Sequence, residues 1–146
     1  MLTQLERVPI FAGLEPGALQ LLAGRAQHSE VQAGSTIVKE GEPGNRFFLI
    51  ESGAVRVVKG LGTADEADLA RLEQNDFFGE MCILETLPRA ATVLALAATR
   101  LSSLSSMAFL QLYEQQPRQY GLLVLNIARD LSRRLRRLDE RFAARH

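Results

Sequence analysis

A glutamate and an arginine nine residues apart, Glu80 and Arg89, are the side chains of this sequence best suited to binding chemistry. Gly79 permits a turn with close backbone approach, so the residues after it can begin a short helix whose free N–H groups point at an anion. Arg89 carries a permanent charge on a fork of donors that fits phosphate oxygens. The Glu80 carboxylate suits a sugar hydroxyl, because it only accepts hydrogen bonds. Together they predict a sugar phosphate site.

The segment around these residues, from Phe77 to Val93, reads FFGEMCILETLPRAATV. It resembles, without a gap, the phosphate-binding cassette of the cyclic nucleotide-binding domains. These occur in regulatory subunits of cyclic-AMP-dependent protein kinase, bacterial cyclic AMP receptor protein and nucleotide-gated channels. A second stretch, IVKEGEPGNRFFLIESG at residues 37–53, resembles the glycine-framed β-hairpin of the same family. The resemblance covers about residues 5–140.

The resemblance implies roles for the matching residues. Glu80 should bind the ribose 2′-hydroxyl, and Arg89 should bind the exocyclic phosphate oxygens with the N–H groups of Gly79, Cys82 and Ala90. The purine should rest on apolar positions of the β-roll. The full set of expected ligand-binding residues is Val57, Leu69, Gly79, Glu80, Met81, Cys82, Arg89, Ala90, Ala91 and Thr92.

Several of these residues also have a purely structural interpretation. Glu80 and Arg89 could form an ordinary surface ion pair with each other, Thr92 could be a strand residue only, and Cys82 could be a small packed hydrophobe that contributes backbone alone. The family's two adjacent hydroxyl residues that contact adenine from the long helix are replaced here by Leu138 and Asp139. Arg134, Arg137 or Phe142 could stack on the base instead.

The elements that must position these residues follow from the spacing of apolar residues and glycines. Residues 1–30 have helical spacing and predict short N-terminal helices. Residues 31–104 consist of short β-branched and aromatic runs separated by glycine turns, with a hairpin tip at GLGTADEAD. Residues 105–146 are helical again. We therefore expect one α+β domain, with an antiparallel, jelly-roll-like β-roll (a double-stranded β-helix) between N-terminal helices and a long C-terminal helix.

The last helix carries a regular apolar pattern from Val124 to Phe142. Its apolar residues are separated by alternating steps of four and three, which is the spacing of a coiled-coil seam: Val124, Ala128, Leu131, Leu135, Leu138 and Phe142. The helix could pack on its own domain, but the seam continues where the β-roll is expected to end. We therefore predict a homodimer through this helix.

Composition excludes several classes of protein. The 146 residues include one cysteine and two histidines, so a disulfide scaffold and a zinc module are both excluded, and no metal or cofactor is expected besides the nucleotide. No apolar run is long enough for a membrane span or signal peptide, which predicts a cytoplasmic protein. Lys plus Arg and Asp plus Glu are balanced at 17 each, although residues 125–146 carry a net +4. The basic character is local and argues against a surface built for nucleic acid.

We expect a non-enzymatic sensor that binds cyclic AMP, with cyclic GMP as the alternative ligand, and signals to an unidentified protein partner through its C-terminal helix. Direct DNA binding is not expected, because the sequence has no helix-turn-helix segment after the long helix. Alternatives are a ligand-free β-roll interaction module, the regulatory domain of a larger enzyme or transporter, and nucleic-acid binding through the arginine-rich helix.

Overall fold

The computed structural model describes residues 2–85 and 87–145. Helical segments α1 (Leu2–Arg7), η1 (Pro9–Phe11) and α2 (Pro16–Arg25) begin the chain, and α4 (Ser106–Gln115) and α5 (Pro117–Arg145) end it. A single helix, α3 (Met81–Leu84), interrupts the strands. The strands are β1 (Gln27–Val31), β2 (Thr36–Val38), β3 (Arg46–Ser52), β4 (Ala54–Lys59), β5 (Ala67–Glu73), β6 (Phe77–Phe78), β7 (Thr92–Ala95) and β8 (Thr99–Ser105).

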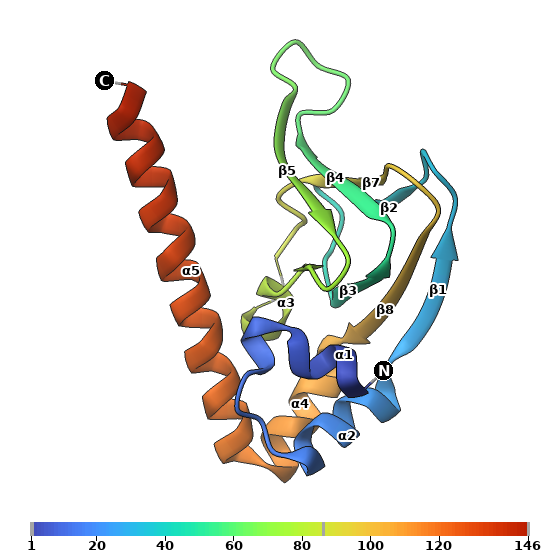
Figure 1. Ribbon diagram of the computed structural model, residues 1–146, viewed down its shortest axis with the longest axis vertical. Coiled ribbons are helices and arrows are strands. Elements are labelled where there is room, and N and C mark those ends of the chain that lie inside the picture. Colours follow the sequence, from blue (N-terminus) through green and yellow to red (C-terminus); the bar gives the residue numbers. More distant parts are fainter. Residues whose placement is uncertain (1, 86, 146) are drawn as a thin grey trace.

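The strands form two antiparallel four-stranded sheets, in the orders β1-β8-β3-β6 and β2-β7-β4-β5. Together they make a β-roll, and the N-terminal helices and α4 lie at one end of it (Figure 1). The expected α+β fold with an antiparallel β-roll and a long C-terminal helix is confirmed.

Strand β3 joins the two apolar cores of the molecule. Phe47 and Leu49 belong to a core shared with the helices, whereas Phe48 and Ile50 face a second core inside the roll. This division follows from the period of two in a strand, because successive side chains point to opposite faces. The strand therefore fixes the roll to the helical layer, and the cassette follows β6, which pairs with β3.

Two boundaries differ from the sequence-based expectation. The first strand begins at Gln27, within residues 1–30 that were expected to be helical, because residues 27–31 pair with Thr99–Ser103 of β8. The second concerns the last helix: the sequence predicts a helix from Leu122, but α5 begins at Pro117, since proline is well tolerated at the first helical position. Ser105 occupies the N-cap position of α4, but its side chain makes no capping hydrogen bond.

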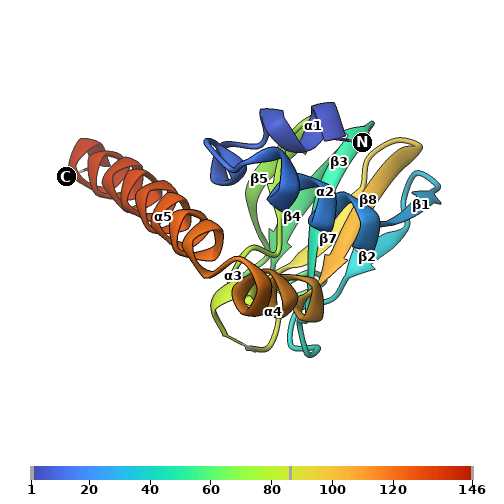
Figure 2. The ribbon, with the colours of Figure 1, turned by 90° about the horizontal axis from the view of Figure 1, so that it is seen from below.

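Helix α5 is packed at its N-terminal end and projects at its C-terminal end. Leu123 and Ile127 are fully buried in the helical core, and Leu131 packs against it. Further along, Leu135 and Leu138 are 62% and 57% exposed. The C-terminal end of the helix projects away from the roll in two perpendicular views (Figures 1 and 2).

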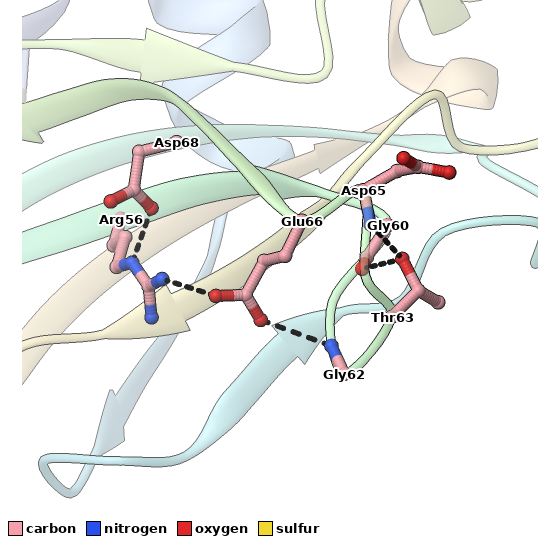
Figure 3. A network of polar contacts seen from close by, with 7 residues as sticks. All are labelled: Arg56, Gly60, Gly62, Thr63, Asp65, Glu66 and Asp68. Carbon is pink, nitrogen blue, oxygen red and sulfur yellow. Dashed lines mark hydrogen bonds and ion pairs between the residues drawn. The ribbon is translucent and has the colours of Figure 1, made fainter.

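The loop between β4 and β5 forms the expected hairpin tip, which side-chain contacts brace. Arg56 donates to Asp68 at 2.5 Å and to Glu66 at 3.3 Å, and Glu66 accepts the Gly62 N–H at 3.0 Å (Figure 3). Because Arg56 lies on β4 while both carboxylates lie on the other arm, the contacts tie the two arms of the hairpin together.

Candidate functional site

The site begins at the turn after β6, where only glycine fits. Gly79 has a φ of +81°, in the left-handed region. A Cβ atom at this position would lie 2.6 Å from the Arg46 carbonyl oxygen and 2.8 Å from Arg89 Nη1. The chain at Gly79 is therefore in close contact with the Arg89 guanidinium, as the proposed phosphate cradle requires.

Helix α3 is packed against the helical core. Phe77, Cys82 and Ile83 belong to the helical core, and the Tyr120 hydroxyl of α5 donates to the Ile83 carbonyl oxygen at 3.2 Å. Burial raises the pKa of the Cys82 thiol to about 11, so the thiol is protonated at neutral pH and acts in packing. The Cys82 N–H donates to the Gly79 carbonyl oxygen at 3.2 Å, so a ligand phosphate would have to share this donor.

Arg89 is fixed by its backbone to the hairpin of the second motif. Its N–H donates to the Glu42 carbonyl oxygen at 2.8 Å, and its own carbonyl oxygen accepts the Gly41 N–H at 2.9 Å. A Cβ atom at Gly44 would lie 2.8 Å from Arg89 Nε. Gly44 of the second motif thus leaves room for the arginine of the first, and the two motifs meet at Arg89.

The Arg89 guanidinium is half-buried and has donors to spare. Nη2 donates to the Arg46 carbonyl oxygen at 3.0 Å, and the group lies over the Phe48 ring, 5.8 Å from its centroid. Burial lowers the pKa of Arg89 from its ordinary value, but the group stays charged at neutral pH. Within residues 2–85 and 87–145 no carboxylate lies within 4.0 Å of it. A half-buried cation of this kind attracts an anion.

Glu80 is only 5% exposed and pairs with helix α5. Arg134 Nη1 donates to Glu80 Oε1 at 2.5 Å, and Arg134 Nη2 lies 3.0 Å from Asp130 Oδ2. The interpretation of Glu80 and Arg89 as a mutual ion pair is therefore wrong. Glu80 Oε2 accepts no hydrogen bond from the described part of the chain, which leaves it available to a hydroxyl donor.

The remaining residues expected to bind ligand are in different environments. Val57 is partly buried against the second core, inside the roll, whereas Leu69 on the neighbouring strand is 51% exposed. The pairing of β4 with β5 is irregular here, since Val57 pairs with Ala70 and Val58 with Asp68. Leu69 is the unpaired residue of this bulge.

The three residues after Arg89 differ in burial. Ala90 is exposed, Ala91 is partly buried, and Thr92 is buried with its hydroxyl accepting the Glu40 N–H at 3.0 Å. This bond gives Thr92 a structural role in joining β7 to the hairpin. Met81, before Arg89 in the chain, is exposed.

The contact between Arg134 and Glu80 was not predicted from the sequence. The sequence suggested stacking on a base as one role for Arg134, and nothing in the spacing of α5 indicates which cassette residue its arginines meet. The partners are 54 positions apart in the sequence, with α3, β7, β8, α4 and the first part of α5 between them, so only the packed structure brings them together. Arg134 also lies over the Phe77 ring, 5.6 Å from its centroid.

A groove beside the cassette, of about 640 Å³, shares only Thr92 with the expected ligand residues. It runs between residues 36–42 and the β4–β5 tip. Its charged lining consists of Glu40, Glu42 and Lys39, so carboxylates outnumber cations. Such a lining does not suit a phosphate group.

A cluster of His28, Glu51 and Ser102 does not have the geometry of a catalytic triad. The Glu51 carboxylate and the Ser102 hydroxyl both lie next to His28 Nδ1, at 2.9 and 3.2 Å, whereas a relay uses the two ring nitrogens separately. Ser102 is also only 2% exposed. Among the residues that the structure describes, no group of three or more acidic, histidine or cysteine side chains could hold a metal ion. None of the described helices combines the length and apolar character needed to cross a membrane.

The chain is similar to several known regulatory proteins. It is 31% identical over 139 residues to a CRP-like cAMP-activated global transcriptional regulator of Mycobacterium tuberculosis, covering 95% of this chain and 60% of the relative. It is 34% identical over 108 residues to a cAMP-dependent protein kinase regulatory subunit of Hypocrea atroviridis, and this match covers 74% of this chain and 22% of that relative. The chain therefore spans less than two thirds of these curated relatives.

Solved structures agree with these relationships. The crystal structure of Thermus thermophilus catabolite activator protein matches with a TM-score of 0.78 and 32% identity, covering 92% of this chain and 62% of that one. The family model for the cyclic nucleotide-binding domain matches residues 28–116, which include β1 to α4 and the whole cassette. The chain belongs to the cyclic nucleotide-binding domain family.

Proposed function

We propose that this domain binds cyclic AMP at the cassette and signals its occupancy through helix α5. The observation that carries the proposal is the half-buried Arg89 guanidinium, held against Gly79 with no carboxylate partner among the described residues. The exocyclic phosphate oxygens would accept from Arg89 and from the cassette N–H groups, and a bidentate guanidinium contact would fix their orientation. The relatives described above include proteins named for cyclic AMP.

The ribose would bind at Glu80. Its 2′-hydroxyl would donate to Oε2, the oxygen that Arg134 does not use. Because the carboxylate is 5% exposed, a hydrogen bond there is made in a water-poor environment and contributes more than one at the surface. The purine would rest on Val57 and Leu69, with Met81 and Ala91 at the edges of the site.

Cyclic AMP is the favoured ligand because Ala90 follows the phosphate arginine. By the resemblance, relatives that favour cyclic GMP commonly have a Thr or Ser here, whose hydroxyl can bond the guanine 2-amino group. A methyl group offers that amino group no partner, at a cost of about 1–3 kcal/mol, or roughly 5- to 150-fold in affinity. Thr92 does not compensate readily, since its hydroxyl is engaged with the Glu40 N–H.

Signalling would run through the ion-pair chain from Glu80 to Arg134 to Asp130. A ligand hydroxyl on Glu80 competes for the charge that holds Arg134, so nucleotide binding and the position of α5 are energetically coupled. The exposed Leu135 and Leu138 of the same helix would form the seam of a homodimer, in which a shift of α5 in one protomer is felt by its partner.

Calorimetric titration of three purified chains with cyclic AMP tests the proposed phosphate contact. Arg89→Ala should weaken binding by about 2–5 kcal/mol, because it removes a partly buried charge partner. Arg71→Ala is the matched control: Arg71 is an exposed arginine paired with Glu73, and its loss should leave the affinity within about twofold. Unchanged binding by Arg89→Ala would contradict the proposal.

A further inference from the structure

A second, smaller cavity lies where helix α5 meets the η1 turn. It has a volume of about 240 Å³ and is lined by Pro9, Ala12, Asn126, Arg129, Asp130 and Arg133. The Asn126 side-chain amide donates to the carbonyl oxygens of Ile10 and Ala12, at 3.0 and 2.8 Å. These two bonds fix α5 against η1 beside the cavity, so its walls are well defined.

The side chains that line the cavity carry more positive than negative charge. Arg129 and Arg133 stand on successive turns of α5, and neither makes an ion pair or hydrogen bond within the described ranges, 2–85 and 87–145. Asp130 is the one carboxylate among the lining residues; its Oδ2 atom forms an ion pair with Arg134 Nη2 at 3.0 Å but accepts no hydrogen bond from the described residues. Like charges four residues apart on a helix repel each other, and a bound anion would relieve that repulsion.

We propose that this cavity is a binding site for a phosphate group, either as free phosphate or on a small molecule. Guanidinium groups present planar forks of donors that match phosphate oxygens, and a tetrahedral anion has enough oxygens to accept from both arginines at once. Two adjacent unpaired guanidinium groups exclude a metal cation as the occupant. The site is separate from the cassette, since Arg129 and Arg133 contact neither Glu80 nor Arg89.

The site can be tested by titrating inorganic phosphate into the ¹⁵N-labelled chain and following the Asn126 side-chain amide by NMR. The Arg89→Gln chain is titrated in parallel, so that phosphate binding at the cassette does not contribute. We expect a saturable shift of the Asn126 amide in both chains. The Arg129→Gln/Arg133→Gln double variant should weaken this binding by about tenfold or more.

The matched control is Arg136→Gln/Arg141→Gln, which removes the same charge from α5 at residues that do not line the cavity. It should change the affinity by less than about threefold, and thermal unfolding should be alike in both double variants. Equal weakening by the two double variants would overturn the proposal in favour of general attraction to a basic helix. Absence of a saturable shift in the unmodified chain would also overturn it.

A parallel titration with glycerol 3-phosphate identifies the source of the phosphate group. Affinity at least equal to that of inorganic phosphate supports a small phosphomonoester, for which the cavity has room. Binding of inorganic phosphate alone supports the free anion. The test does not depend on nucleotide binding, so its failure and the failure of the proposed cyclic AMP site can be told apart.

Discussion

At the scale of single residues, the site depends on three residues of different character at and beside the turn after β6. Gly79 allows the approach, Arg89 supplies a cation without a carboxylate partner among the described residues, and Glu80 supplies a nearly buried carboxylate with one oxygen engaged. Neither charge neutralises the other. This arrangement keeps both groups available to a ligand that carries a phosphate and a hydroxyl close together.

Glu80→Ala should weaken cyclic AMP binding by about 1–3 kcal/mol, because the ribose hydroxyl loses its acceptor. The chain should still fold, since Arg134 keeps its pairing with Asp130. Calorimetry measures the affinity, and circular dichroism checks the fold. Glu85→Ala serves as the control, because Glu85 is an exposed carboxylate of the same segment. Equal affinities for the Glu80→Ala and Glu85→Ala chains would refute the ribose assignment.

Gly79→Ala should be more harmful than Gly62→Ala, although both glycines have the same φ of +81°. The backbone strain of a left-handed alanine, about 1–2 kcal/mol, is common to both changes. Only at Gly79 does the new Cβ atom meet the Arg46 carbonyl oxygen and the Arg89 guanidinium, whereas nothing lies within 4 Å at Gly62. Urea unfolding should show the larger loss of stability for Gly79→Ala, together with weakened cyclic AMP binding. Equal losses of stability in the two variants would show that the structure accommodates a Cβ atom at position 79 as easily as at position 62.

At the scale of helices and strands, the pattern of turn residues and apolar runs predicted the fold well. The glycine turns and short β-branched runs correctly predicted the β-roll, the short helix after Gly79 and the hairpin tip between β4 and β5. The sequence did not place β1, because the exposed polar run at residues 27–31 lacks an apolar alternation and becomes a strand only by pairing with β8. The same limit applies to Arg134, whose contact with Glu80 depends on how α5 packs.

A pH prediction concerns the outer face of the β1-β8-β3-β6 sheet. Burial raises the pKa of Glu51, but the hydrogen bonds from Ser102 and His28, with the charges of His28 and Arg100, outweigh burial and lower the pKa below its ordinary value of 4.5. A carboxylate with a lowered pKa stabilises the fold above its unfolded pKa, and this stabilisation is lost as the pH falls through the folded value.

The free energy of unfolding should therefore fall less steeply below about pH 4.5 in Glu51→Gln than in the unmodified chain. Urea unfolding at a series of pH values from 6 to about 3 measures the slope. Glu114→Gln, at an exposed glutamate of α4, should leave the slope unchanged. A Glu51→Gln chain with the same acid dependence as the unmodified chain would show that these contacts do not depress the pKa.

At the scale of the whole molecule, the apolar seam of α5 is divided between two roles. Leu131 of the seam packs on the chain's own helical core, beside Leu123 and Ile127, which lie outside the seam. Leu135 and Leu138 of the seam are more than half exposed, and the C-terminal end of α5 projects away from the roll (Figure 2). The periodicity predicted one continuous seam and could not show where the domain stops covering it, because that depends on the size of the folded roll.

Leu135→Lys with Leu138→Lys should convert the proposed dimer to a monomer without unfolding the domain, since both side chains are more than half exposed. Sedimentation velocity at tens of micromolar measures the state of association. The matched control places the same two charges at Ser132 and Ala143, exposed positions outside the seam, and should leave the dimer intact. A monomer in the unmodified chain would contradict the proposed homodimer.

Equilibrium titration of the unmodified chain with cyclic AMP and cyclic GMP tests whether the cassette binds a cyclic nucleotide and favours cyclic AMP. We predict saturable binding of one cyclic AMP per chain, with cyclic GMP weaker by roughly 5- to 150-fold. Cyclic GMP binding as tightly as cyclic AMP would contradict the preference assigned to Ala90. Absence of saturable binding by either nucleotide, in a chain shown to be folded, would contradict the proposal that the cassette binds a cyclic nucleotide.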